Sequence, residues 1–187
     1  MSPARKYSYV FLGAVALLSA WMVKEGGQDI VGHGFSPAHS PDYFSIGYTK
    51  LEMDAAGRQK NKLLADKMTH YSDDGTTHTL RPVLFFYSQK MPPWVIQSET
   101  GVLSADGKEL SLNGKVVIER AKTSTARPLK INTANLKVKP ETRYAETRER
   151  AELISPPNVT TGTGMKLVFM SPIQLELLAN VQGNYEK

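Results

Sequence analysis

The sequence predicts a mainly β protein, in which one antiparallel β domain follows a single N-terminal transmembrane α-helix. Three observations support this. Apolar and polar residues alternate along ELSLNGKVVIER, which ends at Arg120, and again from Gln174 to Gln182. Short turn sequences separate about nine such segments, with no convincing helix between them. An uninterrupted apolar run from Tyr7 to Val23 predicts the helix.

The apolar run at residues 7–23 has nearly the length of a membrane span. As a helix it would extend about 26 Å, against roughly 30 Å of bilayer hydrocarbon. Arg5 and Lys6 precede it, which predicts a cytoplasmic N-terminus at residues 1–6. Aromatic residues near its ends are expected to anchor it at the headgroup level: Tyr7, Tyr9 and Trp21. A cleaved signal peptide is the alternative, but Leu18 stands where the cleavage site needs a small residue.

Residues 24–41 are rich in Gly, Pro, Ser and His without any period, which predicts a flexible periplasmic tether. The remaining segment, 42–187, is long enough for one domain with one core. The chain has no cysteine, which excludes disulfides, thiol nucleophiles and Cys-based metal sites. The net charge is +5, but the basic residues are scattered. Because the domain is expected outside the cytoplasm, anionic lipid headgroups are the expected partners and nucleic acid is not.

The expected strands follow one another along residues 42–187. In order they are Phe44–Met53, Lys62–Tyr71, Thr77–Tyr87, Trp94–Thr100, Leu110–Arg120, Leu129–Val138, Arg143–Ile154, Met165–Phe169 and Ile173–Tyr185. Arg143–Ile154 contains good helix formers, but its alternating Ala145, Thr147, Ala151 and Leu153 favour a strand. Gly162-Thr163-Gly164 is expected to be a turn. Consecutive strands with short turns predict an antiparallel meander, which must curl into a β-sandwich or an open jelly roll.

Motifs for catalysis or cofactor binding are missing from the sequence pattern. The histidines have no second His or carboxylate at ligand spacing, so we expect no metal site. No G-x-S-x-G elbow accompanies Asp73, Asp74 and His78, and Gly162 to Lys166 lacks the spacing of a phosphate-binding loop. We therefore expect a protein without enzymatic activity and without a cofactor.

The ordered set of segments resembles a known family. After the apolar span and the tether come TKLEMDAAGRQKNKLLADKMTHYSDDG, RPVLFFY, PPWVIQSETGVLSADGKELSLNGKVVIER, LKINTANLKVKPETRYAET, TGTGMK and NVQGNY. Together they resemble the LptC family, inner-membrane components of lipopolysaccharide export. The resemblance implies an open, V-shaped β jelly roll through which lipid A acyl chains pass. It also implies that the helix and the periplasmic domain contact the transmembrane subunits of an ABC transporter, and that a periplasmic bridge protein receives the lipopolysaccharide.

The alternating strands supply the candidate lining of a lipid groove. From the two clearest strands the candidates are Leu110, Leu112, Val116, Ile118, Leu175, Leu177 and Val181, and from neighbouring strands Leu63, Ala65, Val83, Phe85 and Ile96. The family resemblance adds Tyr48, Thr79 and Tyr185 and again indicates Leu175. The alternative is a membrane-tethered structural adaptor, in which the same apolar face is a sealed core.

The last strand is a candidate docking edge. Ile173 to Tyr185 is long and contains no internal Pro or Lys, the residues that usually protect an edge strand from pairing. We expect the bridge protein to dock on this edge, head to tail.

Overall fold

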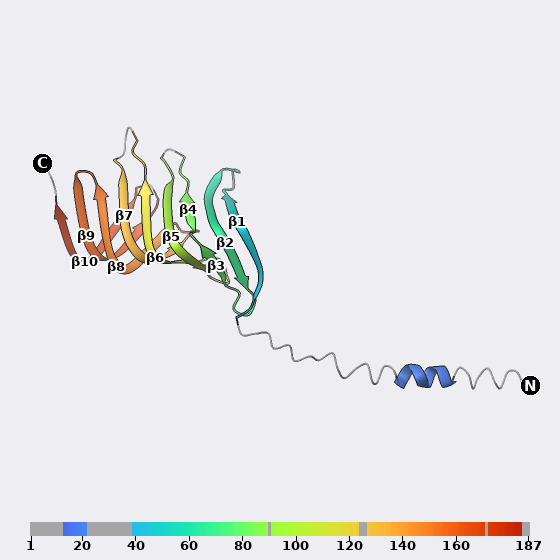
Figure 1. Ribbon diagram of the computed structural model, residues 1–187. Helices are drawn as coiled ribbons and strands as arrows, with labels where there is room; N and C mark the ends of the chain where they lie inside the picture. Colours follow the sequence, from blue (N-terminus) through green and yellow to red (C-terminus); the bar gives the residue numbers. More distant parts are fainter. Residues whose placement is uncertain (1–12, 22–38, 90, 124–126, 171, 185–187) are drawn as a thin grey trace, which may run out of the picture. The chain divides into compact units, whose positions relative to one another are not determined.

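The computed structural model describes residues 13–21, 39–89, 91–123, 127–170 and 172–184 (Figure 1). The chain divides into two compact units, Met1–Ala38 and His39–Lys187. In the first unit residues 13–21 form a helix whose side chains are exposed, Trp21 among them. No helix within the described ranges is both long and apolar enough to cross a membrane. Tyr7 and Tyr9, the predicted anchors at the start of the span, lie outside the described residues.

The second unit is one antiparallel sheet of ten strands (Figure 1). The strands are β1 (Pro41–Met53), β2 (Gln59–Tyr71), β3 (Thr77–Leu80), β4 (Val83–Phe86), β5 (Trp94–Leu103), β6 (Leu110–Arg120), β7 (Leu129–Lys139), β8 (Tyr144–Ser155), β9 (Asn158–Val168) and β10 (Gln174–Asn184). Their order is β1-β2-β3-β5-β6-β7-β8-β9-β10, and β4 lies beside β3, paired with β2 and β5. The predicted meander is therefore confirmed, and β1 and β10 are its two edges.

A row of backbone irregularities runs across five of the ten strands. Residues with positive φ occur at Gly47 in β1, Gly114 in β6, Asn135 in β7, Gly164 in β9 and Asn180 in β10. The register shifts beside the last four of these positions, as bulges do. Bulges increase the local twist and bend a strand, so a row of them makes the whole sheet curl over its apolar face. The strands in Figure 1 curve accordingly along their length.

Contacts between distant strands fasten the curled sheet at one end. The Arg143 guanidinium, in the turn between β7 and β8, donates hydrogen bonds to the carbonyls of Tyr87 (2.8 Å) and Lys60 (3.3 Å). Phe86 in β4 and Trp94 in β5 contact Phe169 just after β9, with ring centroids 5.0 and 5.4 Å apart. Strands from the first and the second half of the sheet order thus meet at this end of the interior.

Two predicted elements were wrong in extent. The expected strand Thr77–Tyr87 is two strands, because Pro82 has no N–H for the ladder and Arg81 adopts a φ of 48°. The expected turn at Gly162 to Gly164 lies inside β9, which begins at Asn158. Gly164 has a φ of 74° there and forms a bulge, so a glycine that resembled a turn signal continues the strand. The strand prediction over Arg143–Ile154 is confirmed by β8.

Candidate functional site

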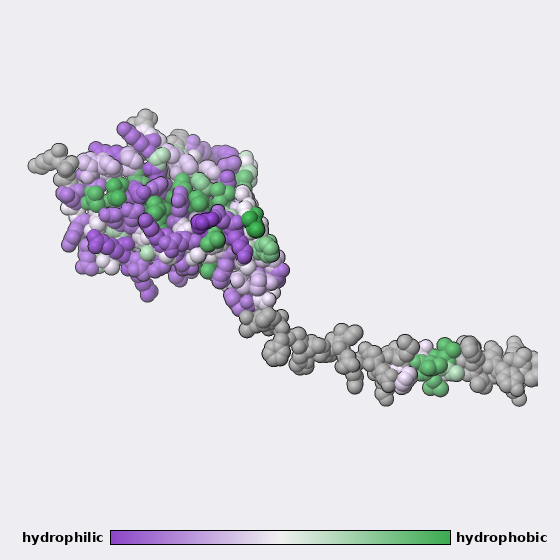
Figure 2. All heavy atoms as spheres, viewed as in Figure 1, coloured by the Kyte–Doolittle hydropathy of each residue, from purple (hydrophilic) through white to green (hydrophobic). Residues whose placement is uncertain are grey.

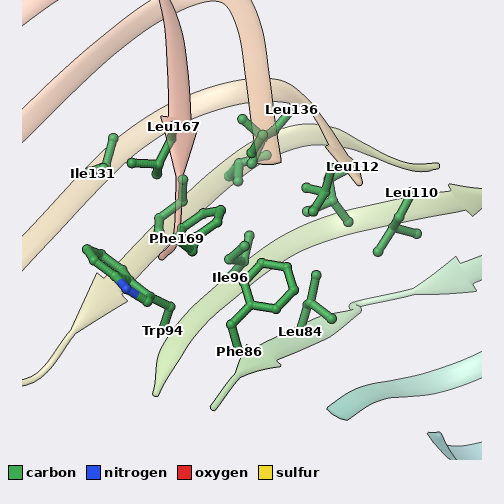
Figure 3. Packing of buried hydrophobic residues seen from close by; sticks show 14 of the residues in the cluster. Leu84, Phe86, Trp94, Ile96, Leu110, Leu112, Ile131, Leu136, Leu167 and Phe169 are labelled. Atoms are coloured by element: carbon green, nitrogen blue, oxygen red, sulfur yellow. The ribbon is translucent and has the colours of Figure 1, made fainter. Parts of the chain in front are cut away.

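The inward face of the sheet carries a continuous row of apolar side chains (Figure 3). Strand register places each member directly opposite the next: Leu63, Leu84, Ile96, Ile118, Ile131 and Leu153. Ile96, Ile118 and Ile131 in the middle of the row are fully buried. Directly opposed apolar side chains on one face contact one another, so this row forms an uninterrupted apolar band from β2 to β8.

A second row runs parallel to the first across the other half of the strands. Its members in register are Leu103, Leu110, Val138, Ala145, Leu167 and Leu175. Leu110, Val138, Ala145 and Leu167 are buried, whereas Leu103 and Leu175 at its two ends are half-buried. The outward residues of the same strands are largely polar, and the surface seen in Figure 2 is mostly hydrophilic with a few apolar groups. The domain therefore has an apolar interior and a mostly polar exterior.

Most of the predicted lining residues meet in this interior. The buried ones are Leu63, Ala65, Thr79, Ile96, Leu110, Leu112, Val116 and Ile118. Tyr48 from β1 and Leu175 and Leu177 from β10 are half-buried and pack against the same cluster from the two edges of the sheet. Burial raises the pKa of the Tyr48 phenol, and the nearby Tyr43 adds to the effect. The Thr79 hydroxyl donates a hydrogen bond to the Gly101 carbonyl at 3.1 Å, which satisfies it within the apolar surroundings.

The predicted inward positions of Val83 and Phe85 are wrong. Register places Leu84 opposite Leu63 and Ile96, so Leu84 and Phe86 face the interior and their neighbours face outward. Phe85 stacks instead with Tyr87 at a centroid distance of 6.1 Å. All four residues of VLFF are apolar, so alternation alone could not indicate which pair is buried.

Two further predicted lining residues, Val181 and Tyr185, lie near the C-terminus. Val181 is 56% exposed, and the bulge at Asn180 separates it from the half-buried residues of β10. Tyr185 lies outside the described residues. The interior also contains residues that the sequence reading did not single out: Leu84, Phe86, Trp94, Ile131, Leu136, Val138, Ala145, Ala151, Met165, Leu167 and Phe169. Asn and Gly residues at bulge positions were the signal that could have located those in β7 and β9.

A cavity of about 280 Å³ lies where the two halves of the curled sheet face each other. Its apolar lining comes from both rows: Leu63, Leu84, Leu103 and Leu110. Polar and charged groups surround that lining: Lys50, Glu52, Asn61, Asp106 and Glu141. An apolar pocket with a charged rim fits an amphipathic ligand, because the chain of such a ligand needs shelter and its head needs polar partners.

Hydrogen bonds order the polar side of this cavity. The Glu52 carboxylate accepts hydrogen bonds from the Lys60 ammonium (2.9 Å) and the Asn61 amide (3.0 Å). Partial burial alone would raise the pKa of Glu52, but these two bonds and the charges of Lys60 and Lys50 outweigh it, so the pKa is lowered. Glu52 is therefore anionic at neutral pH, and Lys50 beside it keeps a cation available at the rim.

Comparison with known proteins is consistent with this architecture. The family model described as "Lipopolysaccharide-assembly, LptC-related" matches residues 12–186. No curated protein matches the sequence significantly. Among solved structures, the domain is similar to LptH from Pseudomonas aeruginosa, described as the LptA homologous periplasmic component of the conserved lipopolysaccharide transport device. That match has a TM-score of 0.52 and 10% identity, and it covers 68% of this chain and 95% of the other, so it shows a shared jelly-roll fold. The chain belongs to the LptC-related family of lipopolysaccharide-assembly proteins.

Proposed function

We propose that this chain is a membrane-anchored carrier of lipopolysaccharide without enzymatic activity, and that its apolar interior holds the acyl chains. The observation that carries the proposal is the pair of inward apolar rows that cross the sheet, the second of which ends at the half-buried Leu175 on the edge strand β10. Tyr48 on β1 and Leu175 and Leu177 on β10 are the residues through which a lipid would first contact the interior. The mixed apolar and charged lining of the cavity between the halves of the sheet also favours an amphipathic ligand.

The energetics fit a carrier that does not bind its cargo irreversibly. Each sheltered CH₂ contributes about 0.8 kcal/mol, so one twelve-carbon chain gains on the order of 10 kcal/mol when fully buried. Several chains enclosed together would leave very slowly. An open sheet that shelters them only partly keeps the lipid mobile, and the energy for directed movement then comes from another protein.

The proposed partners follow from membership of the family. The N-terminal segment at residues 7–23 would anchor the chain in the inner membrane, with residues 1–6 cytoplasmic and the β domain periplasmic. That helix and the domain would contact the transmembrane subunits of the lipopolysaccharide export ABC transporter, which supplies the lipid. A periplasmic bridge protein, with a jelly roll such as that of LptH, would receive it.

We place the bridge protein on β10, which is an edge of the sheet with free hydrogen-bonding groups. Removing residues 173–187 is expected to abolish binding of the bridge protein in a pull-down with the full-length chain as reference. Ile173, Leu175 and Leu177 pack on the core, so circular dichroism must show that the truncated domain is still folded. Undiminished binding by the folded truncation would exclude β10 as the docking edge.

A structural adaptor is the second candidate, and one observation favours it. Ile96, Val116 and Ile118 are completely buried, so the protein's own side chains fill the middle of the interior. In the carrier these side chains must separate when acyl chains enter, whereas in an adaptor they never do. The two functions therefore differ in whether the interior accepts lipid.

Binding of intact and deacylated lipopolysaccharide to the full-length chain in detergent separates the two functions. The carrier is expected to retain the acylated molecule at about one per protein, measured by native mass spectrometry, and not the deacylated saccharide. Retention of neither would support the adaptor. Equal retention of both would point to headgroup binding at the surface and would contradict the role of the interior.

A further inference from the structure

The first residue of the β domain meets the turn between β2 and β3. His39, just before β1, stacks on Tyr71 at the end of β2, with ring centroids 4.0 Å apart and planes 4° from parallel. Its Nδ1 atom lies 3.3 Å from Asp73 Oδ2 and 3.8 Å from Asp74 Oδ2. The three side chains are about half exposed, so a dissolved ion can reach them without opening the fold.

Local hydrogen bonds orient the Asp74 carboxylate of this turn. Asp74 Oδ1 accepts hydrogen bonds from the Thr76 amide (2.8 Å) and the Thr76 hydroxyl (2.7 Å). This leaves Oδ2 as the oxygen directed to His39. The imidazole is oriented by its stacking on Tyr71, so the donor atoms of all three residues converge before any ion arrives.

The spacing of the donor atoms matches a tetrahedral metal site. The three atoms lie within 4.8 Å of one another. Zinc bonds of about 2.0–2.2 Å to nitrogen and carboxylate oxygen place neighbouring ligands of a tetrahedron roughly 3.3–3.6 Å apart. The separations of 3.3 and 3.8 Å around Nδ1 are close to these edges. Calcium and magnesium prefer sets made only of oxygen, so an imidazole among the donors favours zinc.

The geometry points to a zinc-binding site formed by His39, Asp73 and Asp74, with water as the fourth ligand. An ion bound there would connect the residue at which the chain enters the β domain to the turn between β2 and β3, and would hold the start of β1 against β2. Residues 39 and 73 are 34 positions apart, which is why sequence spacing gave no sign of the site.

Zinc titration of the full-length chain in detergent tests this site by isothermal calorimetry. We expect one zinc ion per chain, a higher thermal midpoint with zinc, and no competition from a tenfold excess of magnesium. His39→Gln and Asp73→Asn are each expected to weaken zinc binding at least tenfold. His70→Gln is the matched control, since His70 stacks on Tyr43 and bonds Thr77 outside the donor set, and it should bind zinc as the unmodified chain does.

The alternative interpretation of the same contacts is a hydrogen bond between His39 and Asp73 that holds no metal ion. In that case zinc would not bind with one-to-one stoichiometry. That result, or one-to-one binding that survives both His39→Gln and Asp73→Asn, would overturn the site. Equal competition by magnesium would also overturn the site, because it would show that the acidic turn attracts any divalent cation without selecting zinc. Thermal midpoints of the variants without zinc show whether they remain folded.

Discussion

Phe86→Ala is expected to destabilise the β domain by about 3–5 kcal/mol, the typical cost of removing a buried aromatic side chain. Phe86 is 1% exposed and lies between Leu84 of its own strand and Phe169 beyond β9 (Figure 3). Removing this ring leaves a cavity where distant strands meet, so the curled sheet loses part of the packing that holds these strands together. For a domain of this size the thermal midpoint should fall on the order of 10 °C. Thermal and urea unfolding followed by circular dichroism measure both quantities.

Phe85→Ala is the matched control, since it removes the same side chain from the adjacent residue. Phe85 faces outward, where it stacks on Tyr87 and lies 5.9 Å below the Lys62 ammonium. Removing these contacts should cost about 1 kcal/mol. A loss of stability for Phe85→Ala as large as that for Phe86→Ala would contradict the assignment of inward and outward faces in β4.

Leu177→Asp is expected to reduce lipopolysaccharide transfer roughly tenfold or more, as a buried polar group without partners costs about 1–3 kcal/mol. Leu177 is half-buried on the edge strand β10 and packs against the apolar cluster. Gly162 of β9 leaves the space that this side chain occupies, because a Cβ atom at residue 162 would lie 3.0 Å from that of Leu177. Insertion into the membrane should be unaffected. Transfer from the full-length chain to a bridge protein, reconstituted with labelled lipopolysaccharide, measures the effect.

Leu178→Asp controls for the added charge. Leu178 is the next residue on β10, is 48% exposed and lies beside Lys137 and Arg148 on the outer face. An aspartate there meets water and charged groups of both signs, so transfer should continue at the normal rate. If a folded Leu177→Asp protein transferred lipid normally, or if both variants were equally inactive, the apolar interior would not be the route of the lipid.

The sequence predicted the inward residues correctly in strands where the number of positions from one buried residue to the next stays even despite a bulge. Leu110, Leu112, Val116 and Ile118 all face inward in β6, although a bulge at Gly114 interrupts the strand between them. Val116 follows Leu112 by four positions, an even number, so simple alternation still identifies the buried residues. The antiparallel meander was predictable for the same local reason, since turns and alternation are both encoded within a few residues.

Where a bulge makes the number of positions between successive buried residues odd, the sequence did not predict which residues face the interior. In β7 the buried face passes from Thr133 to Leu136 across Asn135, whose φ is 48°. Alternation alone cannot follow such a shift, because a bulge inserts one residue that breaks the period of two. The approach of His39 to Asp73 was equally hidden, since it depends on how β1 lies beside β2.

Photo-crosslinking in intact cells that export lipopolysaccharide tests the central claim, that the interior carries lipid. A photoreactive aromatic amino acid replaces Tyr48 on β1 or Leu177 on β10, both half-buried against the apolar cluster. The controls are Thr49 and Glu176, the exposed neighbours on the same strands. We expect covalent lipopolysaccharide adducts at Tyr48 and Leu177 and none at the two controls. Adducts at neither inward position, in protein shown to be folded and assembled, would contradict the carrier function and support the structural adaptor.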